Sequence, residues 1–166
     1  MTHLRNDGVT DPSIKDEART PPYLFAQLNT RFGFTGDVAA SDTNHLCPNY
    51  YTKERDALAQ PWFRVSYCNP PYSPGWIDKF LQKAHEESLL GKIVVVLIPA
   101  DLSTGYFRKY CMKAAEWIII DGRVKFNHPN GNQMKGSPKF ASIAYVFDRA
   151  LLEKNGHLVV SLMKWK

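Results

Sequence analysis

The residues best suited to chemistry are the consecutive Asn69, Pro70, Pro71 and Tyr72. The Asn69 side-chain oxygen and the Pro70 carbonyl can both accept a hydrogen bond from one planar NH₂ group. The prolines stiffen the turn and donate no N–H, which leaves their carbonyls free for a ligand. Tyr72 offers a flat ring to the face of a planar base. Accepting both amine hydrogens would aim the nitrogen lone pair at an electrophile, which is catalysis by orientation and electrostatics and requires no strong base.

The surrounding sequence predicts where this turn lies. Val65 to Cys68 is typical of a short β-strand, and apolar residues recur at helical spacing from Trp76 to Leu89. A turn between a strand and a helix lies at the carboxyl end of that strand, where open α/β sheets bind their ligands. The alternative is a merely stiff loop, because Asn and Pro are ordinary turn residues. The aromatic fourth residue and the strand-helix setting favour the functional interpretation.

Strands and helices alternate over most of the chain. Ile93 to Ile98 is continuously apolar and rich in β-branched residues, as expected for a central parallel strand buried on both faces. This alternation predicts an α/β fold with a doubly wound, mostly parallel sheet. The other predicted elements are a helix capped by Thr20 with Pro21 at its first position and ending near Arg31 to Gly33, a strand from Phe34 to Val38, a short helix near Lys53 to Ala59, a helix capped by Ser103 or Thr104, and a strand from Trp117 to Ile120.

The pattern changes after Asp121-Gly122. Strand-like runs from Arg123 to Phe126 and from Phe140 to Phe147 flank a loop rich in Gly, Asn, Pro and Lys, and a last run spans His157 to Met163. These segments predict antiparallel additions at one side of the sheet near the C-terminus.

The length of 166 residues predicts one domain. Residues 1–19 are polar and charged and are interpreted as a flexible N-terminal arm, which leaves 20–166 as the domain. Three cysteines are typical of reduced thiols, and His45 and Cys47 lack a second ligand pair, so no metal is expected. The longest apolar run, Ile93 to Ile98, is too short to cross a membrane, and no signal pattern is present, which favours a soluble intracellular protein.

The charge of the chain permits a polyanionic partner. Lys and Arg exceed Asp and Glu by 21 − 16 = 5, and the pI is about 9.1. Four basic residues in and beside the late loop could attract nucleic-acid phosphates through counterion release, although a solvated basic loop is the alternative. These residues are Arg123, Lys125, Lys135 and Lys139.

Two carboxylates are candidates for binding a cofactor. Asp37 ends the predicted first strand, where it would face a nucleotide-like molecule, and the small residues that follow allow close backbone approach. A helix N-cap or a surface turn is the alternative for Asp37. The absence of Gly-x-Gly-x-x-Gly argues against a dinucleotide, whereas a cofactor without phosphates needs no such cradle. Asp56 could bind an adenine or ribose edge, or it could be an exposed helical carboxylate.

Taken in their order along the chain, these sequence segments resemble the DNA N6-adenine methyltransferases of the small phage and prophage type. That family lies within the Rossmann-like, S-adenosylmethionine-dependent amino-methyltransferases. The resemblance covers Thr20 to Phe147. The chain departs from larger relatives because it lacks their Gly-rich continuation after the first strand, and no acidic residue ends a second strand. The segments that carry the resemblance are Thr20-Pro21-Pro22, Asp37-Val38-Ala39-Ala40, Asp56-Ala57-Leu58 with Trp62, Asn69-Pro70-Pro71-Tyr72-Ser73, Gly122 to Phe126 and Ser137 to Phe147.

The resemblance implies methyl transfer to the N6 amine of adenine in double-stranded DNA, with S-adenosylmethionine as the cofactor and the target base flipped out of the duplex. It also implies a phage or prophage protein in the cytoplasm of a bacterial host, with protection against restriction as one role. A monomer is compatible with the sequence, which leaves the oligomeric state open. The implied cofactor residues are Thr20, Pro21, Asp37, Ala39, Ala40 and Asp56, and the implied catalytic residues are Asn69, Pro70, Pro71 and Tyr72.

Two alternatives remain open at this point. The Asn-Pro-Pro-Tyr turn could grip any planar NH₂ group, including a protein glutamine amide or an RNA base. The chain could also be a catalytically silent DNA-binding relative that retains the fold.

Overall fold

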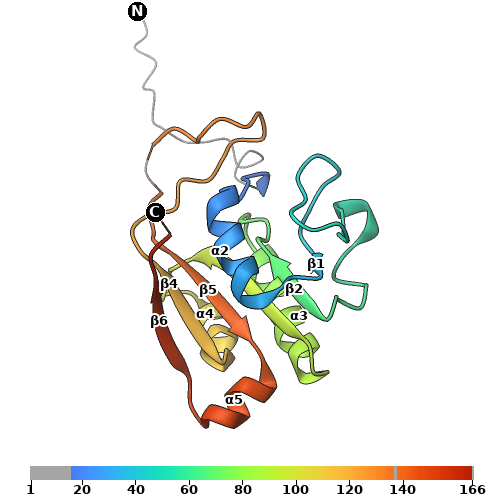
Figure 1. The fold of residues 1–166 in the computed structure, drawn as a ribbon, viewed down its shortest axis with the longest axis vertical. Coiled ribbons are helices and arrows are strands. Elements are labelled where there is room, and N and C mark those ends of the chain that lie inside the picture. Colours follow the sequence, from blue (N-terminus) through green and yellow to red (C-terminus); the bar gives the residue numbers. More distant parts are fainter. Residues whose placement is uncertain (1–15, 137, 166) are drawn as a thin grey trace, which may run out of the picture.

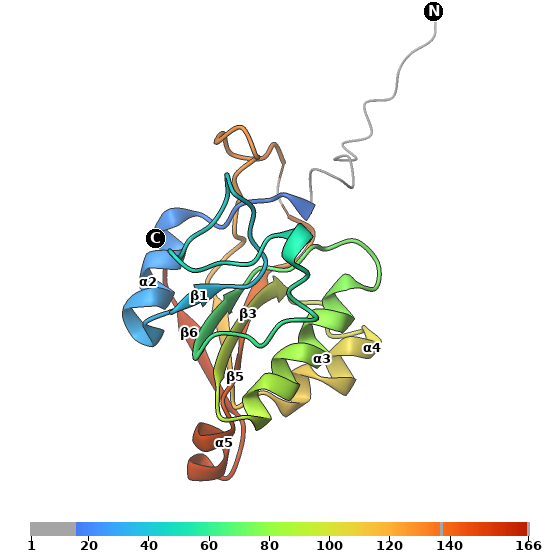
Figure 2. The same ribbon diagram turned by 90° about the vertical axis from the view of Figure 1, so that its right-hand side faces the viewer.

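The computed structural model describes residues 16–136 and 138–165. They form an α/β fold in which a six-stranded sheet lies between helices (Figures 1 and 2). Helix α2 covers one face of the sheet, and α3 and α4 cover the other (Figure 2). The strands are β1 (Gly36–Asp37), β2 (Val65–Cys68), β3 (Ile93–Pro99), β4 (Glu116–Ile120), β5 (Ser142–Phe147) and β6 (Val159–Met163), and the helices are α2 (Pro22–Phe32), α3 (Trp76–Leu89), α4 (Gly105–Lys109) and α5 (Arg149–Asn155).

The sheet has the order β1-β2-β3-β5-β4-β6. Strands β1, β2 and β3 pair in parallel, β5 is antiparallel to both of its neighbours, and β6 is parallel to β4. All strands except β5 therefore run in one direction, which confirms an α/β fold with a mostly parallel sheet. The predicted antiparallel pairing near the C-terminus is confirmed for β5, although β5 lies inside the sheet and β6 is parallel to β4. Helix α5, which the sequence analysis missed, reverses the chain after β5 and lets β6 run parallel to β4.

Strand β3 forms the centre of the core, as its composition predicts. Val94, Val96 and Ile98 pack with α3 and α4, whereas Val95 and Leu97 pack with α2 on the opposite face. Each of these five side chains has 0% of its surface exposed. Successive side chains of a strand point to opposite faces, so a continuously apolar run suits a sheet that is covered on both sides.

The predicted caps are confirmed in part. Thr104 caps α4 by accepting a hydrogen bond from the Phe107 N–H. Thr20 is not the cap of α2: Pro21 holds that position, and the Thr20 hydroxyl lies 2.7 Å from the Tyr67 hydroxyl. Helix α2 ends as expected, because Gly33 adopts the left-handed conformation that closes a helix.

Three predicted elements are shorter or absent. Strand β1 has two residues, and the expected helix near Lys53 to Ala59 is a single 3₁₀ turn (Lys53–Arg55). The expected strand from Arg123 to Phe126 does not form. Val124 and Phe126 are buried there, and only the next residue, Asn127, makes isolated β-bridges, with Arg19 and Gln133.

Gly36→Ala is expected to lower the free energy of unfolding by about 1–3 kcal/mol, because a side chain there would overlap the Phe63 ring. The matched control is Gly105→Ala at the first residue of α4, where a methyl group meets no atom within 4 Å. Urea denaturation of both variants measures the difference. Equal midpoints would contradict the close packing of β1 against Phe63.

Candidate active site

The carboxyl ends of β1, β2 and β3 meet at one edge of the sheet, because these strands are parallel neighbours. Strand β1 ends at Asp37, and β2 leads directly into Asn69. The loop 38–64 and the described part of the loop 121–141 rise from the same end of the molecule, opposite α5 (Figure 1). The sequence prediction for the position of the Asn-Pro-Pro-Tyr turn is therefore confirmed: it follows β2 and precedes α3.

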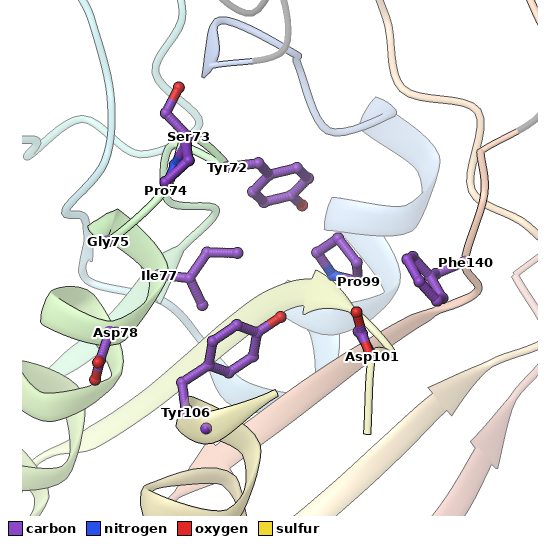
Figure 3. A pocket seen from close by; sticks show the side chains of 11 residues that line it. Tyr72, Ser73, Pro74, Gly75, Ile77, Asp78, Pro99, Asp101, Tyr106 and Phe140 are labelled. Carbon is purple, nitrogen blue, oxygen red and sulfur yellow. The ribbon is translucent and has the colours of Figure 1, made fainter. Parts of the chain in front are cut away.

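This turn contributes to two cavities. A larger cavity of about 560 Å³ is lined by Pro71 together with Ala39, Ala40 and Asp56. A smaller cavity of about 410 Å³ is lined by Tyr72 and the residues that follow it. Figure 3 shows the smaller cavity, with Pro99 at the end of β3, Tyr106 on α4 and Phe140 of the late loop around it. Consecutive residues of the motif thus reach two different hollows.

Hydrogen bonds fix the Asn69 amide. Its Oδ1 atom accepts from the Tyr72 hydroxyl at 2.7 Å, and its Nδ2 atom donates to the Ala18 carbonyl at 3.2 Å. An amide oxygen has two acceptor sites, so one remains for a ligand. Among the described residues, no group donates to the carbonyl of Pro70 or Pro71. The acceptors that the sequence predicted thus have unused hydrogen-bonding capacity, although Pro70 is buried and neither Asn69 nor Pro70 lines a cavity.

Tyr72 is held by both its ring and its hydroxyl. The hydroxyl lies 2.7 Å from Asn69 Oδ1 and 3.2 Å from the Leu97 carbonyl. The ring packs edge-on against Phe126, with 6.0 Å between the ring centroids. Burial raises the pKa of the Tyr72 hydroxyl, which keeps it protonated and able to donate. The hydroxyl of Tyr72 thus contacts Asn69, in addition to the ring face that the sequence analysis assigned to a planar base.

Residues 16–19, here called the N-terminal strap, bind the motif. The Asp16 carboxylate accepts from the Ser73 N–H at 2.8 Å and from the Ser73 hydroxyl. Ala18 accepts from Asn69, and Arg19 exchanges two backbone hydrogen bonds of 2.8 Å with Asn127. The predicted flexible arm ends with these residues, which contact the site, whereas 1–15 lie outside the described residues.

Asp37 shapes the loop that follows it. The residue is 4% exposed, and its carboxylate accepts from the N–H groups of Ala39 at 3.2 Å and Leu46 at 3.1 Å. Ala39 and Ala40 consequently line the larger cavity, although Asp37 does not. Burial raises the pKa of the Asp37 carboxyl from 3.8 to about 6, against the lowering effect of the two N–H donors.

The Asp37 carboxyl gives the protein a pH-dependent stability. Between pH 3.8 and about 6 the folded state binds more protons here than the unfolded state, so the free energy of unfolding falls as the pH rises. The fall is at most about 3 kcal/mol. We expect Asp37→Asn to lack this component and to gain stability relative to the native sequence between about pH 4 and pH 7. Urea denaturation at both values measures it, and a pH-independent difference would contradict the assignment.

Asp56, which the sequence analysis predicted as a cofactor residue, lies in the lining of the larger cavity. It follows the 3₁₀ turn with a φ of 46°, and its carboxylate accepts from the Leu58 N–H at 3.2 Å. The Trp62 indole anchors this segment by donating to the Ala57 carbonyl at 2.8 Å. A non-glycine residue in the left-handed region costs energy and often lies at a functional site.

Several residues of the larger cavity were not predicted. Trp76 and Phe80 were assigned to the core side of α3, and Tyr51 lay in a segment without a clear pattern. The Nε atom of Arg19, another lining residue, is buried and has no hydrogen-bond partner among the described residues. Conversely, Thr20 and Pro21 line neither cavity. No local sequence signal marks such residues, because the folding of loop 38–64 and the strap brings them together.

The four basic candidates are exposed in the described part of loop 121–141. This loop borders both cavities, since Pro129 lines the larger one and Phe140 lines the smaller one. The Lys139 ammonium lies 5.1 Å from the centre of the Phe140 ring. The remaining candidates are Arg123, Lys125 and Lys135.

The described residues contain no group of three or more His, Cys, Asp or Glu side chains placed to hold a metal ion. All three cysteines are buried free thiols, and burial raises the pKa of Cys47 and of Cys111 to about 12. In ranges 16–136 and 138–165, no helix has the length and hydropathy needed to cross a membrane.

A mostly parallel sheet with cavities at its carboxyl edge is typical of the α/β proteins that bind nucleotide-like ligands. A family model described as DNA N-6-adenine-methyltransferase (Dam) matches residues 8–164. The chain therefore belongs to this family of adenine-specific DNA methyltransferases, as its resemblance implied.

Individual relatives agree with the family. The DNA N-6-adenine-methyltransferase of Escherichia phage T1 is 31% identical over 164 residues, which cover 96% of this chain and 68% of the phage protein. The protein of the same name from Haemophilus phage HP1 is 32% identical over 130 residues, or 75% of this chain and 74% of that protein. The putative methyltransferase YfdM of Escherichia coli K12 is 35% identical over 81 residues, which cover 43% of this chain and 89% of YfdM.

Proposed function

We propose that this protein transfers a methyl group from S-adenosylmethionine to the N6 amine of adenine in DNA, on a Rossmann-like fold. The observation that carries the proposal is the position of the Asn-Pro-Pro-Tyr turn, which contributes Pro71 to one cavity and Tyr72 to another. A transferase that joins a cofactor to a base requires such a meeting point. Family membership supplies the type of reaction.

The larger cavity fits the methyl donor. Its volume of about 560 Å³ is in the range of small-molecule sites, and Ala39 and Ala40 leave room beside the backbone. Asp56 supplies a carboxylate for a hydroxyl or amine of the nucleoside. Asp37 and Thr20 do not line the cavity and are proposed to support it indirectly. Asp37 accepts from the Ala39 N–H, and the Thr20 hydroxyl is hydrogen-bonded to the Tyr67 hydroxyl. When bound, S-adenosylmethionine supplies a methyl group activated by a sulfonium.

The flipped adenine is proposed to lie against Tyr72, beside the smaller cavity. Asn69 Oδ1 and the Pro70 carbonyl accept the two N6 hydrogens, which turns the nitrogen lone pair away from these acceptors. Flipping costs a few kcal/mol. Stacking on an aromatic ring returns about 1–3 kcal/mol, and the amine hydrogen bonds add to it. The product proton is lost to water or to a nearby acceptor.

Exposed basic residues of loop 121–141 are proposed to contact DNA phosphates. The double variant Lys125→Ala/Lys135→Ala should reduce the slope of log K against log salt by about 2, since each lost phosphate contact removes about 0.9. The matched control is Arg149→Ala/Lys154→Ala on α5, at the opposite end of the molecule (Figure 1). Fluorescence anisotropy with a DNA duplex at several salt concentrations gives both slopes. Equal slopes would contradict this interface.

The substrate class is tested by offering the purified protein DNA, RNA and a protein mixture with labelled S-adenosylmethionine. Label in DNA, recovered as N6-methyladenine after hydrolysis to nucleosides, is the expected result. Label in RNA or in glutamine would replace the proposed substrate. Failure to bind S-adenosylmethionine in calorimetry would favour a catalytically silent relative.

A further inference from the structure

The Arg19 side chain, which lines the larger cavity, has an unused donor. Its Nε atom is buried without a hydrogen-bond partner in residues 16–136 and 138–165, and its Nη2 atom reaches only Thr43 Oγ1, at 3.5 Å. Burying a charged donor without an acceptor is unfavourable, so such a group indicates a missing partner. The Arg19 backbone is fixed by two hydrogen bonds of 2.8 Å to Asn127, which gives the side chain a defined origin.

The other charges of the larger cavity restrict the kind of partner. Among the described lining residues most ionisable groups are acidic, and the only cation besides Arg19 is the exposed Lys53. A ligand that suits this lining carries positive charge and one anionic group, and the half-buried Arg19 is the better donor for that group. An amino-acid end, with an ammonium and a carboxylate, has this chemistry. The acidic lining residues are Asp16, Glu17, Glu54 and Asp56.

We propose that Arg19 binds the α-carboxylate of the methionine part of the methyl donor. The assignment rests on the proposed function, which places that donor in the larger cavity. A guanidinium fork matches a carboxylate with two parallel hydrogen bonds, and Nε is one of its donors. The N-terminal strap thereby joins the donor to the catalytic turn, because Ala18, the neighbour of Arg19, accepts from Asn69.

Two ligands that differ at the amino-acid end test the assignment by calorimetry. S-adenosylhomocysteine carries the α-carboxylate, whereas 5′-methylthioadenosine retains the nucleoside and sulfur but lacks the amino-acid end. Arg19→Ala should weaken binding of S-adenosylhomocysteine by about tenfold to a hundredfold, as expected for a charge-assisted contact, and leave 5′-methylthioadenosine within about twofold. Arg19→Lys keeps the charge without the fork and should give an intermediate loss. Arg55→Ala, an exposed arginine outside the lining, is the control.

Equal weakening of both ligands in Arg19→Ala and Arg19→Lys would overturn the assignment and indicate a structural role. Unchanged binding of S-adenosylhomocysteine in both variants would also overturn it, while leaving the proposed function intact. If the unchanged protein bound neither ligand, the proposed cofactor and this assignment would both be refuted. Thermal denaturation of each variant shows whether it is folded.

Discussion

Asn69→Ala is expected to lower kcat for methyl transfer by about 100- to 1,000-fold, the usual effect of removing one aligned catalytic hydrogen-bonding group. The variant loses the Oδ1 acceptor for the adenine amine, and the Tyr72 hydroxyl loses its partner at 2.7 Å. The affinity for S-adenosylhomocysteine should stay within about threefold of the native value. The two hydrogen-bond partners of Asn69, Ala18 and Tyr72, do not line the larger cavity. Single-turnover kinetics and calorimetry measure the two effects.

Two further variants sharpen this test. Asn69→Asp keeps an acceptor for Tyr72 but loses the donor to the Ala18 carbonyl, so its activity should lie between those of the native protein and Asn69→Ala. Asn155→Ala, at the end of α5 and far from the site (Figure 1), should be fully active. Substantial residual turnover in Asn69→Ala would refute the role of this amide.

Two substitutions of Tyr72 are expected to separate the effect of stacking on the base from the effect of orienting Asn69. Tyr72→Ala removes both the ring and the hydroxyl and should lower kcat/KM by about 100-fold or more, because a base-stacking ring contributes about 1–3 kcal/mol. Tyr72→Phe keeps the ring and loses the hydrogen bond to Asn69, so a loss of about tenfold, mainly in kcat, is expected. Steady-state kinetics on a duplex substrate distinguish the two variants.

The control for Tyr72 is Tyr23→Ala on α2, because Tyr23 is 60% exposed. It should leave kcat/KM unchanged. If the Phe and Ala variants of Tyr72 lose the same activity, the ring does not stack on the base and only the hydroxyl matters. If Tyr72→Phe is fully active, the hydrogen bond to Asn69 contributes nothing to orientation.

Local patterns were sufficient to predict the part of the fold that carries the turn. Strand β2 occupies Val65–Cys68 and helix α3 spans Trp76–Leu89, both as expected, and β3 extends the predicted apolar run by one residue. These elements have strong signals, because an uninterrupted apolar strand or a helical stripe identifies the buried face without reference to the rest of the chain. The position of the Asn-Pro-Pro-Tyr turn follows from the order of β2 and α3.

The errors concern pairing between distant segments. Strand β5 has the composition of a buried strand, but no local pattern shows that it lies between β3 and β4. Val124 and Phe126 alternate with basic residues as in a strand. Both side chains are buried, but their segment forms no ladder of backbone hydrogen bonds. The N-terminal strap is polar because its groups bind the turn, and a polar composition alone is equally typical of a flexible arm.

Some of the predicted site residues line a cavity, and others do not. Asp56 and Ala39, two predicted cofactor residues, line the larger cavity, whereas Asp37 lies outside the lining and its carboxylate accepts from two backbone N–H groups. Arg19 was missed because its significance depends on one buried nitrogen without a partner, which only the folded arrangement reveals.

The most direct test is a crystal structure of the protein with S-adenosylhomocysteine and a DNA duplex that contains its target adenine. We expect the adenine outside the duplex, with N6 within about 3 Å of Asn69 Oδ1 and the base against Tyr72. The sulfur of S-adenosylhomocysteine should lie in the cavity lined by Ala39 and Asp56. An adenine still stacked in the duplex, or a cofactor outside that cavity, would contradict this expectation.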